Sequence, residues 1–521
     1  MKIRINQIDL PPGYSPEQLL GAAAKKVRCK PDLLQQIKTV RRSIDARGHA
    51  PRITVAAEAE FSGKRPSGLR DVESAKASPA TVLPGIKKPS GPRPVVFGAG
   101  PAGLMAAYAL AECGWSPLLI ERGEPAAQRT EQVESFWKDG TLNIESNVLY
   151  GEGGAGLFSD GKLTSRAKDR ARVQRFLEIL VACGASPDIL IDAEPHIGSD
   201  ILHDLVPALR NRIISMGGEM RFGARLDELQ IENGAIRGAV ISGKAMRTDC
   251  VVLATGHSAR DIYTMLAEKG VALEPKPFAV GVRIEIPQCR IDAAQWGKSY
   301  PTIGKASFRM TRREENDARA CYTFCMCPGG LVMSCASSEE LITTNGMSLS
   351  KRDKTYGNAA FLVPVFPPDF PAAERAELAG IAFQKKLESA AFTAGGSDYS
   401  LPAQRLVEFL DGSPATSLPQ DRSCNRAIPV SLRDLLPDFV QHTLLAAVPK
   451  MLRSLRGVRL EEALVYASET RSSSPVRVVR GEDGQSPTRG LYPCGEGSGY
   501  AGGIVSSGID GLRTAEAITS A

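Results

Sequence analysis

The chain has 521 residues, of which 43% are hydrophobic and 23% charged, a balance typical of a globular protein with several domains. No apolar run approaches the roughly 18 residues of a membrane-spanning helix, so we expect no membrane span. The first residues lack an apolar segment, so we expect no secretory signal there. The 11 cysteines are odd in number and scattered, which suits reduced thiols in a cytoplasmic protein better than a disulfide framework.

Positive charge is concentrated near the N-terminus. Residues 1–94 hold 18 Lys and Arg against 8 Asp and Glu, whereas the whole chain has a net charge of only +6. A basic module can meet RNA, an acidic partner or an acidic substrate. Because no aromatic residues are interleaved with the basic ones, a solvated surface is the simpler interpretation, and nucleic acid is the less favoured partner.

Residues 1–62 predict a small α+β module. Residues 2–10 alternate as a strand does, and Ser15 with Pro16 marks the start of a helix. Residues 37–46 and 53–61 then predict two further strands, an order that indicates a ferredoxin-like half-sandwich. Residues 63–93 are rich in Gly, Pro, Ser and Lys without periodicity, which predicts a linker.

The next unit follows the pattern strand, glycine turn, helix, strand, acid. The apolar run Val95 to Phe97 leads into Gly98-x-Gly100-x-x-Gly103, a helix follows directly, and a second apolar strand ends at Glu121. This is the dinucleotide-binding fingerprint in its required context. The glycines allow a tight turn, close approach of a pyrophosphate and helix–strand packing, and the acid accepts hydrogen bonds from a ribose.

A second literal GxGxxG begins at Gly151 and has a different interpretation. It is followed by the turn Ser159-Asp160-Gly161 rather than by an apolar helix, and no acid-tipped strand stands at the right distance. A glycine-dense loop lets the backbone lie against a flat ring, so we expect it to form part of a flavin pocket. Ser159, Lys162 and Arg166 are candidate pocket residues, with ordinary surface positions as the alternative.

The middle of the chain alternates helices and strands. Helices are expected over 170–184 and 200–216, strands over 220–225 and 226–231, and a hairpin turn at Asn233-Gly234. A buried strand over 250–253 ends in Ala254-Thr255-Gly256, and His257 follows it, either near a cofactor or in a structural role.

Residues 275–425 predict an inserted substrate domain, and helical residues 432–455 are expected to return to the first domain. Arg471 begins a polar cluster that either caps a loop or lines a pocket. The chain then repeats a glycine turn and a helix from Gly495 to Ile518. The first domain is therefore expected in two parts, 94–274 and 426–521.

Three cysteines, Cys321, Cys325 and Cys327, share one face of the strand predicted at 322–327. Metal sites usually need four ligands and no histidine is nearby, so we interpret them as buried small residues and predict no metal site.

Together, the motifs at 98–103, 151–163, 322–330, 469–476 and 494–504 resemble the uncharacterised bacterial FAD-dependent (NAD/FAD-utilising) dehydrogenases, related in fold to the glutathione-reductase-type flavoproteins. The resemblance implies an α/β protein: a Rossmann-like FAD-binding domain, an inserted α+β substrate domain and the small N-terminal module. It also implies that Glu121 binds the adenosine ribose, that Glu496 lies on the ribityl or phosphate side, and that the helix after Gly503 points at the flavin pyrimidine edge. The residues expected to bind FAD are Gly98, Ala99, Gly100, Pro101, Ala102, Gly103, Glu121, Arg122, Arg129, Gly153, Gly154, Gly156, Leu226, Ala254, Thr255, Gly256, Gly495, Glu496, Gly502, Gly503 and Ile504.

The sequence thus predicts a cytoplasmic FAD-dependent oxidoreductase that transfers a hydride between a small-molecule substrate and flavin. Because no second acid-tipped unit is present, NAD(P)H is expected at most as a transient reductant. No Cys-x4-Cys pair follows the first unit, which argues against disulfide reductase chemistry. Three alternatives stay open: a flavin monooxygenase, an RNA- or partner-binding flavoprotein that uses the basic module, and a flavin-binding protein without turnover.

Overall fold

The computed structural model describes residues 1–47, 50–63, 68–75, 93–164, 167–297, 300–314 and 319–520. Most of the linker predicted at 63–93 lies outside these residues, as does Arg166. No described helix combines the length and apolar character that crossing a membrane requires.

The N-terminal module is an antiparallel sheet covered on one face by a helix. Its sheet order is β2-β3-β1-β4, which is that of a ferredoxin-like half-sandwich, although the described residues contain one α-helix between strands where that fold has two. The helix starts with a capping box in which Ser15 accepts from the Gln18 backbone, and Pro16 occupies its first turn. The elements are β1 (Lys2–Leu10), α1 (Pro16–Val27), β2 (Leu34–Asp45), β3 (Arg52–Phe61) and β4 (Val72–Ser74).

The second unit is built on a five-stranded sheet of order β23-β11-β5-β6-β7, in which every neighbouring pair is parallel. The three central strands, β11, β5 and β6, are fully apolar, as expected for a parallel sheet covered on both faces. The last strand and last helix of the chain complete this domain. Its sheet and central helices are β5 (Val95–Phe97), α2 (Pro101–Glu112), β6 (Leu118–Ile120), α5 (Ser199–Ser215), β7 (Glu219–Arg221), β11 (Val251–Leu253), β23 (Leu491–Pro493) and α12 (Ile504–Ser520).

Helix α2 packs between this sheet and α12, and it is apolar on all sides because it is buried on all sides. Small residues allow the two helices to approach: a Cβ at Gly511 would lie 2.2 Å from the Ala102 carbonyl oxygen. The predicted strand over 220–225 is shorter than expected because it ends at Arg221. Smaller elements surround the sheet. They are α3 (Ala126–Asp139), α4 (Arg170–Ala182), the hairpin strands β8 (Leu226–Glu232), β9 (Ala235–Ile241) and β10 (Lys244–Arg247), α6 (Arg260–Glu268), β12 (Leu273–Pro275) and β22 (Val476–Val478).

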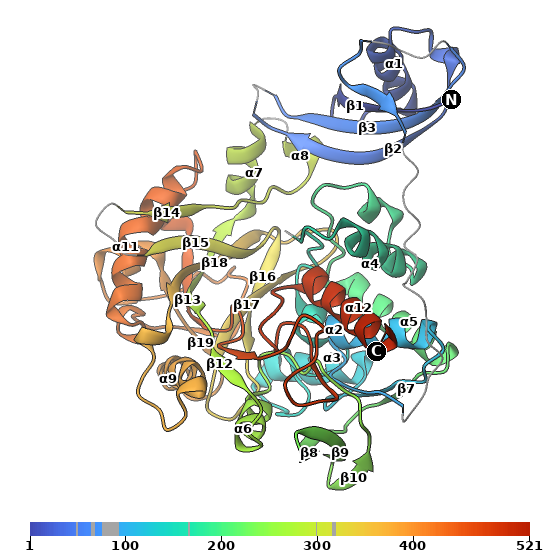
Figure 1. Ribbon diagram of the computed structural model, residues 1–521. Helices are drawn as coiled ribbons and strands as arrows, with labels where there is room; N and C mark the ends of the chain where they lie inside the picture. Colours follow the sequence, from blue (N-terminus) through green and yellow to red (C-terminus); the bar gives the residue numbers. More distant parts are fainter. Residues whose placement is uncertain are drawn as a thin grey trace.

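The third unit is a seven-stranded sheet of order β14-β15-β18-β13-β21-β19-β20 with a separate two-stranded hairpin. Figure 1 shows it on the left, with the helices of the parallel-sheet domain on the right and the N-terminal module above both. Its strands are β13 (Phe278–Pro287), β14 (Thr311–Arg313), β15 (Ala320–Cys327), β16 (Gly330–Cys335), β17 (Thr343–Ser348), β18 (Tyr356–Val365), β19 (Leu401–Arg405), β20 (Ala427–Pro429) and β21 (Leu464–Glu469). Its helices are α7 (Gln288–Trp296), α8 (Tyr300–Ile303), α9 (Ala379–Ala394), α10 (Leu406–Asp411) and α11 (Asp438–Arg453).

The predicted end of the inserted domain at residue 425 is wrong. Strand β21 pairs with both β13 and β19, and α11 buries Val440, Leu444 and Val448 in the same core as Val282 and Phe361. The apolar spacing of α11 correctly indicates an amphipathic helix, but it does not say which sheet the helix covers. The chain returns to the parallel-sheet domain only after β21.

Candidate cofactor-binding site

A cavity of about 2550 Å³ opens where β5, β6 and β11 end, lined there by Gly98, Glu121 and Ala254. Ligands of parallel α/β sheets bind at this carboxyl edge. The cavity extends past the seven-stranded sheet and reaches the N-terminal module at Tyr14 and Arg42. Its size exceeds the 300–1000 Å³ or so of an ordinary ligand pocket, so it has room for more than one molecule.

The three fingerprint glycines have different surroundings. Gly98 has φ +100°, and a Cβ there would lie 2.4 Å from the Ala254 carbonyl oxygen. A Cβ at Gly103 would lie 1.9 Å from the Gly98 carbonyl oxygen. Gly100, the N-cap of α2, lines the cavity, and its Cβ position has no neighbour closer than the Gly154 Cα at 3.8 Å. Packing therefore requires Gly98 and Gly103, whereas Gly100 leaves an open cradle at a helix N-terminus.

Glu121 is only 5% exposed and joins both glycine turns. Its carboxylate accepts hydrogen bonds from the backbone N–H of Ala99 at 2.7 Å, and from those of Gly123 and Gly151 at 3.0 Å each. Because Oε2 accepts one of these three bonds, it keeps acceptor capacity for a ribose hydroxyl on the cavity side.

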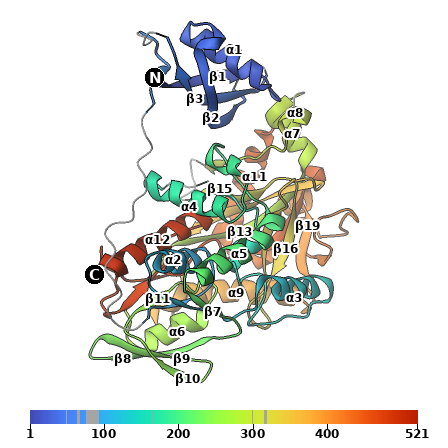
Figure 2. The same cartoon turned by 90° about the vertical axis from the view of Figure 1, so that its right-hand side faces the viewer.

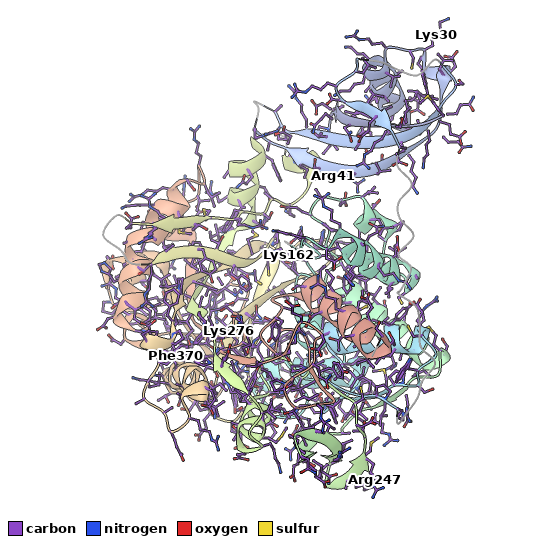
Figure 3. All side chains as sticks on the ribbon, in the orientation of Figure 1. Lys30, Arg41, Lys162, Arg247, Lys276 and Phe370 are labelled. Carbon is purple, nitrogen blue, oxygen red and sulfur yellow. The ribbon has the colours of Figure 1, made fainter. Side chains whose placement is uncertain are left out.

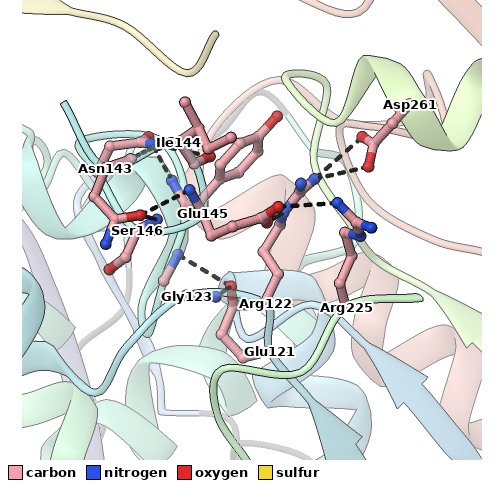
Figure 4. A network of polar contacts seen from close by, with 12 residues as sticks. Glu121, Arg122, Gly123, Asn143, Ile144, Glu145, Ser146, Arg225 and Asp261 are labelled. Carbon is pink, nitrogen blue, oxygen red and sulfur yellow. Dashed lines mark hydrogen bonds and ion pairs between the residues drawn. The ribbon is translucent and has the colours of Figure 1, made fainter. Parts of the chain in front are cut away.

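Arg122 lines the same end and is held by an ionic network (Figure 4). Its guanidinium donates to Glu145 at 2.7 Å and to Asp261 at 3.1 Å, and it lies 4.4 Å from the centroid of the Tyr150 ring. Arg225 donates to the other oxygen of Glu145. The network fixes the Arg122 guanidinium against the Tyr150 ring at the predicted adenosine end of the cavity.

The second glycine loop packs onto the first turn. Gly153 donates its N–H to the Ala99 carbonyl at 2.8 Å. The fully buried Arg129 donates to the carbonyls of Asn147, Val148, Glu152 and Gly154 at 2.7–2.9 Å. Gly153 and Arg129, both expected to touch the cofactor, lie behind the cavity wall and shape it.

The C-terminal turn also divides between packing and lining positions. Gly495 donates its N–H to Asp510 at 2.7 Å, and its Cβ position is 2.6 Å from the Ala102 Cβ, so it fixes α12 against α2. Gly502 and Gly503 line the cavity at the start of α12 with no atom within 4 Å of either Cβ position. Two helix N-termini, from opposite ends of the chain, thus border one cavity.

The predicted cofactor residues divide accordingly. Ala99, Gly103, Arg129, Gly153 and Gly495 do not line the cavity. Those that do are Gly98, Gly100, Pro101, Ala102, Glu121, Arg122, Gly154, Gly156, Leu226, Ala254, Thr255, Gly256, Glu496, Gly502, Gly503 and Ile504.

Glu496 and His257 form a pair on the cavity wall, with Nδ1 of His257 3.6 Å from Oε1 of Glu496. Burial raises the pKa of the Glu496 carboxyl to about 7, although the Lys276 ammonium opposes the shift. Burial and the cations of Arg471 and Arg260 lower the pKa of His257 to about 4. The imidazole is therefore neutral at pH 7, and its Nε2 is buried without a hydrogen-bond partner in the described part of the chain.

A buried ionic network lies next to His257, and the sequence did not predict it. Glu388 of α9 accepts hydrogen bonds from Arg260 at 2.8 Å and from Arg471 at 2.9–3.0 Å. Despite burial, the two guanidinium groups hold the pKa of Glu388 well below its usual range. Arg471 also lines the cavity, so it both braces its loop and faces the site. Its partners are too distant in the chain for any local pattern to reveal them.

The opposite wall is formed by the segment after the second glycine loop and by β15 of the seven-stranded sheet. Ser159 and Lys162 line the cavity, and Asp160 between them binds Arg352 through both carboxylate oxygens. The prediction that three cysteines share a buried face is wrong for Cys325. A bulge in β15 gives Cys325 a φ of +42° and exposes it to the cavity, whereas Cys321 and Cys327 are buried. No group of metal-ligating side chains occurs in the residues that the structure describes.

The fold and cavity define the class: an α/β protein with a parallel five-stranded sheet and a dinucleotide-type glycine turn at its carboxyl edge. The chain belongs to the same family as a Clostridium beijerinckii protein, itself described as uncharacterized, which is 38% identical over 543 residues and covers 99% of this chain and 98% of that one. Residues 277–472 match the family "FAD-dependent protein, C-terminal domain-like", and residues 2–60 match a domain of unknown function.

More distant similarity extends to two further proteins. Protein FixC of Salmonella typhi is 26% identical over 213 residues, covering 38% of this chain and 44% of its own length. A solved glycerol-3-phosphate dehydrogenase of Bacillus halodurans, in complex with FAD, is 13% identical with a TM-score of 0.34, covering 82% of this chain and 64% of its own.

Proposed function

We propose that this protein is an FAD-dependent oxidoreductase, a dehydrogenase that passes a hydride between a small-molecule substrate and flavin. The observation that carries the proposal is the open cradle at Gly100, together with Gly502 and Gly503 at a second helix N-terminus that lines the same cavity. A dinucleotide is long enough to need contacts from both, and the match of residues 277–472 to an FAD-dependent family supports FAD as that dinucleotide.

The residues that would hold FAD have distinct tasks. The N-terminus of α2 at Gly100 offers backbone N–H groups and a positive dipole end to the diphosphate. Glu121 accepts hydrogen bonds from the adenosine ribose, and the start of α12 favours negative charge near the ring system. When bound, FAD supplies the two-electron chemistry that the amino acids lack. The Glu496 carboxyl, with a pKa of about 7, can exchange a proton with a bound molecule near neutral pH, whereas His257 stays neutral there and can only donate or accept a hydrogen bond.

The experiment is to purify the protein, record its absorbance, denature it and identify the released chromophore. We expect a yellow protein that releases FAD, and anaerobic titration with candidate donors should bleach the flavin band. A colourless protein that does not take up added FAD would contradict the proposal. Bleaching by NAD(P)H alone would reveal a transient nicotinamide site, and oxygen incorporated into a product would favour a monooxygenase.

A cytoplasmic location is part of the same proposal. All 11 cysteines are unpaired, as expected in a reducing compartment. Fractionation of cells that express the tagged protein tests it.

A further inference from the structure

The cavity is larger than one cofactor requires, and its outer end has a chemistry of its own. The nucleotide-binding turns border one end, and the N-terminal module with the α7–β14 region borders the other. Figures 1 and 2 both place β2 of the module beside α8. This outer part has room for a second molecule in the same cavity as the cofactor.

Apolar side chains cover one side of the outer end. Ile37, Ile44 and Ile53 of the module face it, together with Trp296 of α7 and Phe308. Ile44 is 44% exposed, so it presents apolar surface to this end of the cavity. The module is fixed here by Arg42, which forms an ion pair with Asp192 at 2.7 Å and exchanges backbone hydrogen bonds with Ile191 and Ala193.

Cations without their own counter-ion lie on the other side. Arg309 and Lys351 line the cavity and have no hydrogen bond or ion pair with any described residue. Lys162 Nζ lies 3.9 Å from Asp160, but that carboxylate is already bound by Arg352. Among described acidic residues at this end, Glu194 alone lacks an ionic partner.

Backbone contacts bring together the segments that carry these cations. Met310, just before β14, exchanges hydrogen bonds with Thr323 of β15, and the antiparallel register of the two strands places Arg309 opposite Phe324, next to Cys325. Burial raises the pKa of the Cys327 thiol on the same strand, and the positive charge of Lys162 opposes this shift. Lys351 directly precedes Arg352, which binds Asp160, two residues before Lys162. Figure 3 shows Lys162 between the two sheet domains.

We propose that the outer end of the cavity is the substrate site and that it takes an anion with an apolar body: the anionic group binds Lys162 and Arg309, and the apolar body packs against Ile44, Trp296 and Phe308. This rests on the proposed function for its identity as the substrate site. A cationic molecule would meet uncompensated like charge, and a small polar anion would leave the apolar wall exposed to water. The N-terminal module thereby acquires a role as one wall of the site.

The test compares naphthoate with naphthamide, which share an apolar body and differ in charge. Calorimetric titration of the FAD-loaded protein at low ionic strength should give naphthoate at least a tenfold or so tighter Kd, since a hydrogen bond to a charged group contributes about 1.5–3 kcal/mol. Lys162→Met and Arg309→Met should each remove most of that preference without changing the affinity for naphthamide. Ile44→Asp should weaken both ligands.

Arg247→Gln is the matched control. Arg247 is an exposed cation on β10, far from the cavity, and should leave both affinities unchanged (Figure 3). Equal binding of the two ligands, no binding of either, or a preference that survives both cation variants would overturn the proposal. Flavin content, measured separately by absorbance, reports on the proposed function. If the protein holds no FAD, the same titrations still measure the charge preference, so the two failures are distinguishable.

Discussion

Gly100→Ala separates a glycine required by a ligand from one required by packing. Gly100 has φ −77°, which any residue adopts, and no atom lies within 3.8 Å of its Cβ position. The substitution should therefore change the stability of the cofactor-free protein by no more than about 1 kcal/mol, the scale of an N-cap change. The added methyl group occupies the cradle, however, and would move the diphosphate away from the N-terminus of α2. Losing one or two charge-assisted hydrogen bonds costs about 3 kcal/mol, or about 100-fold in Kd.

The assay is thermal unfolding with and without FAD at 100 times the Kd of the unmodified protein. At that concentration, FAD stabilises the unmodified protein by about 2.7 kcal/mol, and a 100-fold weaker Kd reduces this to about 0.4 kcal/mol. Gly103→Ala is the contrasting variant, because its methyl group would lie 1.9 Å from the Gly98 oxygen and should destabilise the protein by about 1–3 kcal/mol with or without FAD. Gly21→Ala in α1, where the Cβ position is open, is the control. If Gly100→Ala retains full stabilisation by FAD, the diphosphate does not lie in this cradle.

Three further variants test the wall of the cavity and the module. Glu388→Gln leaves Arg260 and Arg471 buried without a full counter-charge and should cost about 3–5 kcal/mol in urea unfolding at pH 7; because the native pKa is lowered, the stabilising contribution should fade as pH falls below about 4.3. For Glu496 the sign is opposite, because a raised pKa means that the folded protein binds the proton more tightly than the unfolded chain does. Without FAD, the stability of the protein should therefore fall as the pH rises from about 4.3 to 7. Glu496→Gln should flatten this pH dependence and stabilise the protein by about 1–2 kcal/mol at pH 8. Arg42→Ala breaks a half-exposed ion pair and should change global stability by less than about 1 kcal/mol, but hydrogen exchange at the backbone amides of positions 42 and 193 should become faster; unchanged exchange would show that the module is held elsewhere.

The parallel-sheet unit could be predicted from the sequence because its signals are local. The strand, turn, helix and acid occur within about 25 residues, and each residue type is required by its immediate neighbours. The Asn233-Gly234 turn was predictable for the same reason, since both residues adopt the positive φ that a two-residue hairpin requires.

The features that the sequence did not predict depend on contacts between distant segments of the chain. The stripe on α11 shows that one face is buried, but the choice between two sheets is made by tertiary packing. A bulge moves Cys325 out of an alternation that the letters alone preserve. The sequence also contains two equivalent-looking glycine positions, Gly495 and Gly502, of which one packs against α2 and the other faces the cavity. Such a distinction becomes visible only when the space around each Cα is known.

The cofactor pocket is built from segments that lie far apart in the chain, and this has a consequence for biosynthesis. Gly100 is translated long before β23 and the helix that begins at Ile504. Until then the nascent sheet lacks its β23 edge, and α2 lacks the helix that covers it. The cofactor pocket therefore forms only after β23 and α12 have been translated. Ribosome-bound chains that end before α12 should expose apolar surface and recruit chaperones.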